Sequence, residues 1–98
     1  MNVYGSRTHA MDQLKDAVAA ALDLEFESRE SYYLCGSYWL SHENWHEKVT
    51  VQENCLEDDG EHFEPDFPEH RVLLYVEADL DETPLEAIEG LELLETRE

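Results

Sequence analysis

The sequence predicts a single α+β domain, in which a largely antiparallel sheet of about four to five strands carries an N-terminal helix and a short C-terminal helix on one face. Three observations lead to this fold class. Apolar residues have a clear helical period over residues 9–22, strand-like patterns recur over residues 24–56, and one unbroken apolar run occupies residues 72–76. The 98 residues suffice for one hydrophobic core, so we expect the element order α-β-β-β-β-α-β within one domain.

The N-terminal part divides into a tail and a helix. Residues 1–8 show no hydrophobic period, so we interpret them as a flexible tail that precedes a domain over residues 9–98. Met11 is a second candidate for the start of translation. Over residues 9–22, apolar side chains recur at helical spacing, and this segment is predicted to be an amphipathic helix.

Three strands are predicted next in the chain. Residues 24–29 alternate between apolar and polar, residues 32–40 are the most aromatic segment, and residues 47–56 alternate again. The third of these strands has two valines on one face and three polar side chains on the other, namely Lys48, Thr50 and Gln52.

The next segment, residues 57–70, contains two prolines, one glycine, seven acids and no base. Proline excludes both a central strand and a helix interior, so we expect a long acidic loop, held to the domain by Phe63 and Phe67. Loops of this length within a compact domain are often functional, although a solvated connector is an equally good interpretation.

The last third of the chain is predicted to contain the central strand and a short helix. Residues 71–78 include the apolar run and read as a strand buried on both faces. Thr83 and Pro84 have the residue types of a helix start, and Gly90 has that of a helix end. Residues 91–96 fit either a final strand beside the central one, reached by a right-handed crossover, or a continuation of the helix.

The charge of the chain is its most unusual property. There are 25 acidic and 6 basic residues, which gives a net charge of −19. Residues 1–52 hold 8 acids and 4 bases, whereas residues 53–98 hold 17 acids and 2 bases, so the second half is the polyanion. Such a surface repels nucleic acid and anionic membranes and attracts a protein with a basic groove. A homodimer is also compatible with the sequence.

Location and thiol state are predicted together. The chain has no apolar segment long enough to span a membrane and no secretion signal, so we expect a cytoplasmic protein. Cys35 and Cys55 lack the C-x-x-C spacing, and in that compartment we expect two reduced, buried thiols.

One zinc-protease pattern occurs by spacing, because His42, Glu43 and His46 match H-E-x-x-H. The pattern requires a helix, but these residues lie between two predicted strands and no third ligand follows. We therefore interpret them as a hairpin turn and keep His42 and His46 only as weak metal candidates. With no G-x-S-x-G motif and no glycine-rich phosphate loop, we expect no cofactor and no catalytic residues.

The acidic loop also contains imidazoles and carboxylates that could hold a cation between them, but the spacing before Gly60 does not fit a calcium loop. A protein partner is the better expectation for this segment. The predicted partner-binding residues combine acids in and beside the loop with two tryptophans, which are frequent anchors in interfaces. They are Glu53, Glu57, Asp58, Asp59, Glu61, Glu64, Asp66, Glu69, Trp39 and Trp45.

In its small size, acidic excess and lack of catalytic motifs, the chain resembles small acidic inhibitors, namely immunity proteins of nuclease toxins and phage anti-restriction or anti-CRISPR proteins. The resemblance is one of overall character and transfers no residues. It implies that the chain occupies a basic nucleic-acid-binding surface of a nuclease, a toxin or a CRISPR effector. Two alternatives remain: a structural or housekeeping domain with a salt-adapted surface, and more remotely the H-E-x-x-H zinc hydrolase.

Overall fold

The computed structural model describes residues 1–31, 35–44, 47–56, 60–77 and 80–97, and for residues 31, 42–44 and 47 it describes the backbone alone. Within these described residues, six strands, one α-helix and one 3-10 helix, η1, follow one another. Their order and bounds are β1 Asn2–Ser6, α1 Met11–Leu22, β2 Glu27–Ser31, β3 Gly36–Asn44, β4 Glu47–Glu53, β5 Val72–Glu77, η1 Thr83–Ala87 and β6 Leu91–Thr96.

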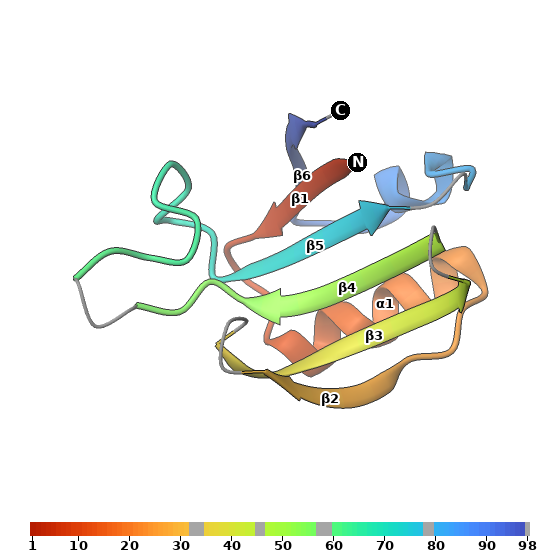
Figure 1. The fold of residues 1–98 in the computed structure, drawn as a ribbon. Coiled ribbons are helices and arrows are strands. Elements are labelled where there is room, and N and C mark those ends of the chain that lie inside the picture. The colour runs from red at the N-terminus through yellow and green to blue at the C-terminus, as the bar shows by residue number, and fades with distance from the viewer. Residues whose placement is uncertain (32–34, 45–46, 57–59, 78–79, 98) are drawn as a thin grey trace.

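The strands form one sheet in the order β2-β3-β4-β5-β1-β6, and every neighbouring pair is antiparallel. The predicted α+β class is therefore confirmed. β5 is confirmed as a central strand, since it pairs with β4 on one side and with β1 on the other, and its residues Val72 to Val76 are all buried. α1 lies behind β3 and β4 in Figure 1, across one face of the sheet.

The prediction of a flexible tail over residues 1–8 is wrong. Asn2–Ser6 form β1, which lies inside the sheet between β5 and β6, and Val3 is fully buried there. Backbone hydrogen bonds to two neighbouring strands fix this segment. A strand of five residues is too short to show a clear hydrophobic period in the sequence. The sheet consequently has six strands and not four or five.

In the C-terminal part, the predicted final strand over residues 91–96 is confirmed, but its predicted position beside the central strand is wrong. Residues 83–87 form the 3-10 helix η1, and residues 91–96 form strand β6, so the helix does not continue through this segment. β6 does not lie beside β5, because β1 pairs with both of them and separates them. The chain therefore passes from β5 to β6 over one intervening strand, at the edge of the sheet.

Boundaries of the remaining elements shift by a few residues. α1 begins at Met11, where the Gln13 Oε1 accepts a hydrogen bond from the Ala10 N–H, and it ends as Asp23 takes a left-handed φ of 54°. β2 and β3 begin at Glu27 and Gly36, three and four residues later than predicted, and β4 ends at Glu53. The pattern of alternation located these strands but not their ends.

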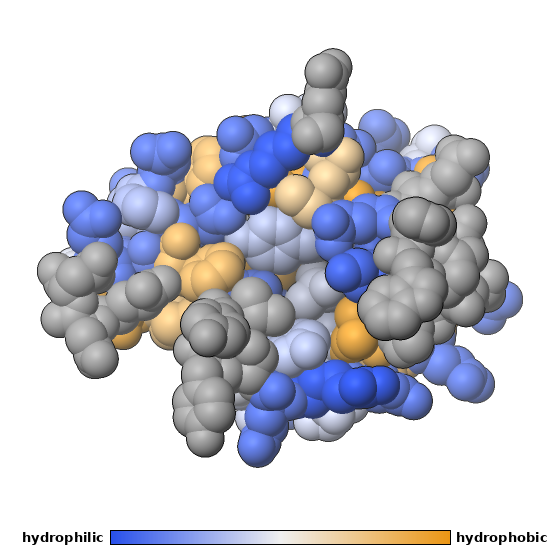
Figure 2. Space-filling view, viewed as in Figure 1, coloured by the Kyte–Doolittle hydropathy of each residue, from blue (hydrophilic) through white to orange (hydrophobic). Residues whose placement is uncertain are grey.

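The two faces of the sheet are built differently. On the face covered by α1 and η1, the core consists of buried leucines and valines: Leu14, Val18, Val49, Val51, Val72, Leu74, Val76 and Leu85. On the opposite face, called the open face here, Val3, Leu73 and Tyr75 form a smaller cluster, against which Phe63 from the acidic loop packs. In Figure 2, which views the open face, apolar and weakly polar surface gathers around the middle, with strongly hydrophilic surface around it.

The prediction of two reduced thiols is wrong, because Cys35 and Cys55 form a disulfide with a Cα–Cα distance of 5.9 Å. Their pairing follows from strand register. Trp39 is opposite Val51 in the β3–β4 pair, and continuing that register outward by four residues brings Cys35 opposite Cys55. The absence of a C-x-x-C spacing was therefore no guide, since antiparallel strands bring distant cysteines together.

Candidate functional site

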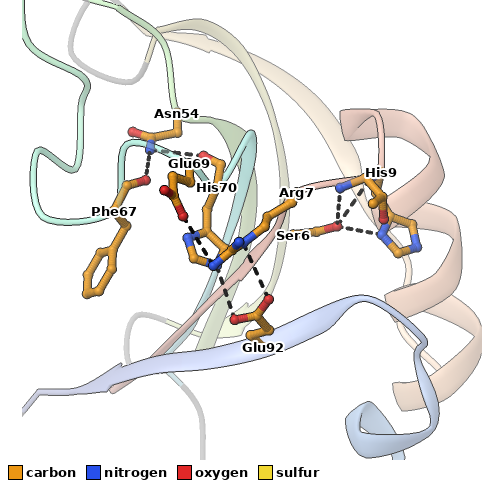
Figure 3. Close-up of polar contacts among 9 residues, drawn as sticks. Ser6, Arg7, His9, Asn54, Phe67, Glu69, His70 and Glu92 are labelled. Carbon is orange, nitrogen blue, oxygen red and sulfur yellow. Dashed lines mark hydrogen bonds and ion pairs between the residues drawn. The ribbon is translucent and has the colours of Figure 1, made fainter.

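The described part of the acidic loop, residues 60–70, is held to the domain by the side chain of Asn54. This residue follows β4 and is 5% exposed. Its Nδ2 donates to the backbone carbonyls of Phe67 at 2.8 Å and His70 at 3.0 Å, and its Oδ1 accepts from the Glu64 N–H at 2.8 Å. Figure 3 shows the first two bonds converging on one amide group. One side chain thus fixes three backbone groups of the loop.

A second set of contacts joins the end of the loop to the edge strand β6. Arg7 lies 3.3 Å from Glu69 and 3.6 Å from Glu92, and the His70 Nε2 lies 3.3 Å from the Glu92 Oε2 (Figure 3). Arg7, Glu69 and Glu92 are all exposed, and ion pairs of that kind contribute little stability. The Asn54 side chain therefore contributes more to the position of the loop than these ion pairs do.

The structure separates the residues predicted from the sequence to contact a partner. Four of the acids are exposed, on or next to the loop: Glu53, Glu61, Asp66 and Glu69. Glu64 is only 9% exposed and has its hydrogen-bond partners inside the protein. Glu57, Asp58, Asp59, Trp45 and His46 lie outside the described residues, as does the side chain of His42.

Trp39 does not share a surface with the acidic loop, because its side chain lies on the face of the sheet that α1 covers. Its ring packs against the main core, and its Nε1 donates to the Asp12 Oδ1 at 3.0 Å. The Lys15 Nζ lies 4.3 Å from the centre of the same ring. Trp39 thus joins β3 to α1, a structural role that fits its partly buried position.

The buried Glu64 belongs to a polar cluster on the open face. It accepts from the Tyr75 hydroxyl at 2.6 Å and from the Arg97 Nη2 at 3.0 Å. Burial, the Glu64 hydrogen bond and its negative charge all raise the pKa of Tyr75 above the ordinary value. Hydrogen bonds to Glu95 and then to Glu64 raise the pKa of Arg97, so the charged guanidinium neutralises the buried carboxylate.

Beside this cluster the open face contains a hollow with a volume of about 440 Å³. Its floor is polar and buried and consists of Thr50, Gln52, Glu64 and Tyr75. Tyr38, Leu40, Phe63 and Met1 contribute apolar surface, and the charged side chains at its margin are Lys48, Glu77 and Arg97. Sequence reasoning did not select this site. The feature of the sequence that could have identified it is the alternation of polar residues along β4, but such alternation usually indicates a strand face exposed to solvent.

No arrangement for binding a metal ion is found in the part of the chain that the structure describes. No three His, Cys, Asp or Glu side chains there are grouped so as to hold a metal ion. The backbone of His42, Glu43 and Asn44 belongs to strand β3, whereas H-E-x-x-H sites require a helix. Among the described helices, none has the length and apolar character to cross a membrane.

Comparison of this chain with protein-family models, with curated proteins and with solved structures finds no match.

Proposed function

We propose that this protein is a non-catalytic inhibitor, which binds the basic nucleic-acid-binding surface of a partner protein through its acidic loop. The partner class is a nuclease, a toxin of the nuclease type or a CRISPR effector. One observation carries the proposal: the Asn54 side chain holds the loop backbone at three points and so presents its exposed carboxylates in a fixed arrangement. A preorganised loop loses less conformational entropy on binding than a mobile one.

Charge supports the same function. The net charge of −19 speeds encounter with a basic partner and repels free nucleic acid. Glu61 and Asp66 are exposed on the loop, in contrast to Glu64, which is buried beneath it. The contact surface is therefore the solvent side of residues 60–70, together with Glu53 where β4 ends.

The first test is an affinity pull-down from the source cells at about 0.15 M salt, eluted with rising salt and identified by mass spectrometry. The proposal predicts one nuclease, toxin or CRISPR effector that elutes late. A broad set of basic proteins that all elute at low salt would contradict it and favour the salt-adapted surface.

A charge-reversal pair then tests the position of the contact. Replacing Glu61 and Asp66 with lysine should weaken binding of the captured partner at least about tenfold, since buried charge pairs dominate the dissociation rate. The matched control replaces Glu25 and Glu30, two exposed acids outside the loop, and changes the net charge equally. Equal losses in the two variants would contradict the assignment of the contact to the loop.

The location of the protein belongs to the proposal as well. The sequence alone favours the cytoplasm, whereas the Cys35–Cys55 disulfide favours an oxidising compartment, because cytosolic thiols are kept reduced. We give the disulfide more weight, which favours a nuclease or a nuclease-type toxin over an intracellular CRISPR effector as the partner. A thiol-reactive reagent should then leave both cysteines unlabelled in protein taken from the source cells, and full labelling before reduction would restore the cytoplasmic location.

A further inference from the structure

The hollow on the open face has the properties of a small-molecule site, independently of the inhibitor function proposed above. Its volume of about 440 Å³ lies within the range of about 300–1,000 Å³ found for ligand pockets. It lies over β4 and β5, the two strands that the main core supports from the other face. The backbone beneath it is therefore rigid, as a binding site requires.

Gln52 places a buried amide group at the hollow. The residue is 1% exposed and lines the floor of the hollow, yet its Nε2 has no hydrogen-bond partner among the described residues. Buried amide groups in native proteins almost always have partners, because an unsatisfied one costs stability. An amide nitrogen only donates, so the group that would satisfy it is an acceptor oxygen.

Lys48 supplies the second anchor, four residues earlier on the same face of β4. Within the part of the chain that the structure describes, it forms no ion pair, whereas Arg97 is already bound to Glu64 and Glu95. The Cα atoms of Lys48 and Gln52 lie about 13 Å apart along the strand, and both residues line the hollow. A ligand that reaches both is elongated, with a neutral acceptor at one point and a negative charge at another.

The apolar walls define the rest of the ligand. Tyr38 and Leu40 are exposed toward the hollow from β3, and Phe63 borders it from the acidic loop. A ring or aliphatic chain packs against such surfaces. Because the Glu77 carboxylate lies at the same margin as the Lys48 ammonium group, the site fits a monoanion better than a phosphate.

We propose that the hollow binds an acylated amino acid group, in which an amide carbonyl accepts from Gln52, a nearby carboxylate pairs with Lys48, and the acyl part packs against Phe63. This chemistry occurs in free N-acyl amino acids and at the C-terminus of a peptide. Of these two sources we assign the free N-acyl amino acid, because the hollow has the volume of a small-molecule site.

The test is a titration of the full chain with N-benzoylglycine, followed by backbone amide NMR spectra. The proposal predicts saturable shifts in β4 and β5 and none in α1. Gln52→Met and Lys48→Met should each weaken binding about tenfold, the usual effect of losing a hydrogen bond to a charged or buried group. The control is Arg29→Met, which removes the same charge from strand β2, two strands away from β4 and outside the hollow, and should bind normally.

Two more arms make every outcome decisive. The methyl ester of the probe keeps the carbonyl and loses the charge, so it should bind about as weakly to the normal protein as the probe does to Lys48→Met. This arm needs no variant to fold. A tetrapeptide with a C-terminal glycine, in which the preceding residues form the acyl group, should bind no more tightly than the probe. Tighter binding of this peptide would assign the site to a peptide C-terminus. Absence of saturable shifts, or equal binding by the ester, would overturn the proposal while leaving the acidic-loop function untouched.

Discussion

The two faces of the sheet use the same strands for different purposes. Along β4, Val49 and Val51 face α1 and are almost fully buried in an apolar core, whereas Thr50 and Gln52 face the other way and are just as buried. Among the described residues, the first face has no buried side-chain nitrogen or oxygen without a hydrogen-bond partner, and the second includes such an atom, the Gln52 Nε2. The difference suggests that the helix-covered face provides stability and that the open face is built for binding.

The largest expected effect comes from the helix-covered face. Leu14→Ala removes a fully buried side chain of α1 and should lower the free energy of unfolding by about 2–5 kcal/mol, through lost burial and the cavity left behind. Leu40→Ala, at a partly exposed position on the open face, should cost only about 1 kcal/mol. Denaturant unfolding measures both, and equal losses would erase the distinction between the faces.

Reduction of the disulfide should have the next largest effect. Cys35 and Cys55 are 20 residues apart, and opening a loop of this length costs about 3 kcal/mol in the chain-entropy description. Because Cys35 comes just before β3 and Cys55 shortly after β4, hydrogen exchange should increase near Tyr38 before it increases in α1. Uniform acceleration over both regions would show that the two faces unfold as one unit.

Asn54→Ala tests how the acidic loop is attached to the open face. It removes three hydrogen bonds to loop backbone, each of about 1 kcal/mol, and should cost about 2–3 kcal/mol. Asn2→Ala, which loses side-chain bonds to Glu82 and Thr96 nearer the surface, is the matched control and should cost less. Proteolysis of the loop in Asn54→Ala should accelerate, and an unchanged rate would contradict the role of this anchor.

The smallest effect concerns two tyrosines on opposite faces. Tyr75 donates to Glu64 on the open face, Tyr4 donates to Glu82 on the other, and in both cases burial and the carboxylate raise the pKa. Stability from these neutral phenols is fully present below about pH 10, the unfolded value, and is lost as the pH rises above it. Absorbance titration should detect both phenolates only on unfolding. Ionisation of Tyr75 near pH 10 in the folded protein would contradict its burial.

The sequence predicted the elements that depend on local patterns and missed those that depend on pairing between distant residues. α1 and β5 were predictable because period and burial are local properties, and the acidic loop was predictable from its prolines. β1 was missed because its five residues become a strand only through pairing with β5 and β6, which lie at least 66 residues away. The disulfide was missed for a related reason, since strand register sets it and cysteine spacing does not.

The candidate sites show the same limit. Glu61 and Asp66 were predicted to contact a partner because of their charge, but nothing in the sequence distinguished these exposed acids from the buried Glu64. Gln52 was read as one of three polar residues on a strand face, and its burial comes from the loop and neighbouring strands that close around it. A buried polar residue on an alternating strand cannot be recognised until its neighbours are known.

The most direct test of the division between the faces is the free energy of unfolding of Gln52→Met, measured in denaturant beside the normal protein. If the Gln52 amide is unsatisfied in the free protein, the apolar replacement of similar size should stabilise the fold by about 1 kcal/mol, the opposite sign to Leu14→Ala. A loss of stability would mean that the amide already serves the folded structure, and the open face would then be a second core and no binding site.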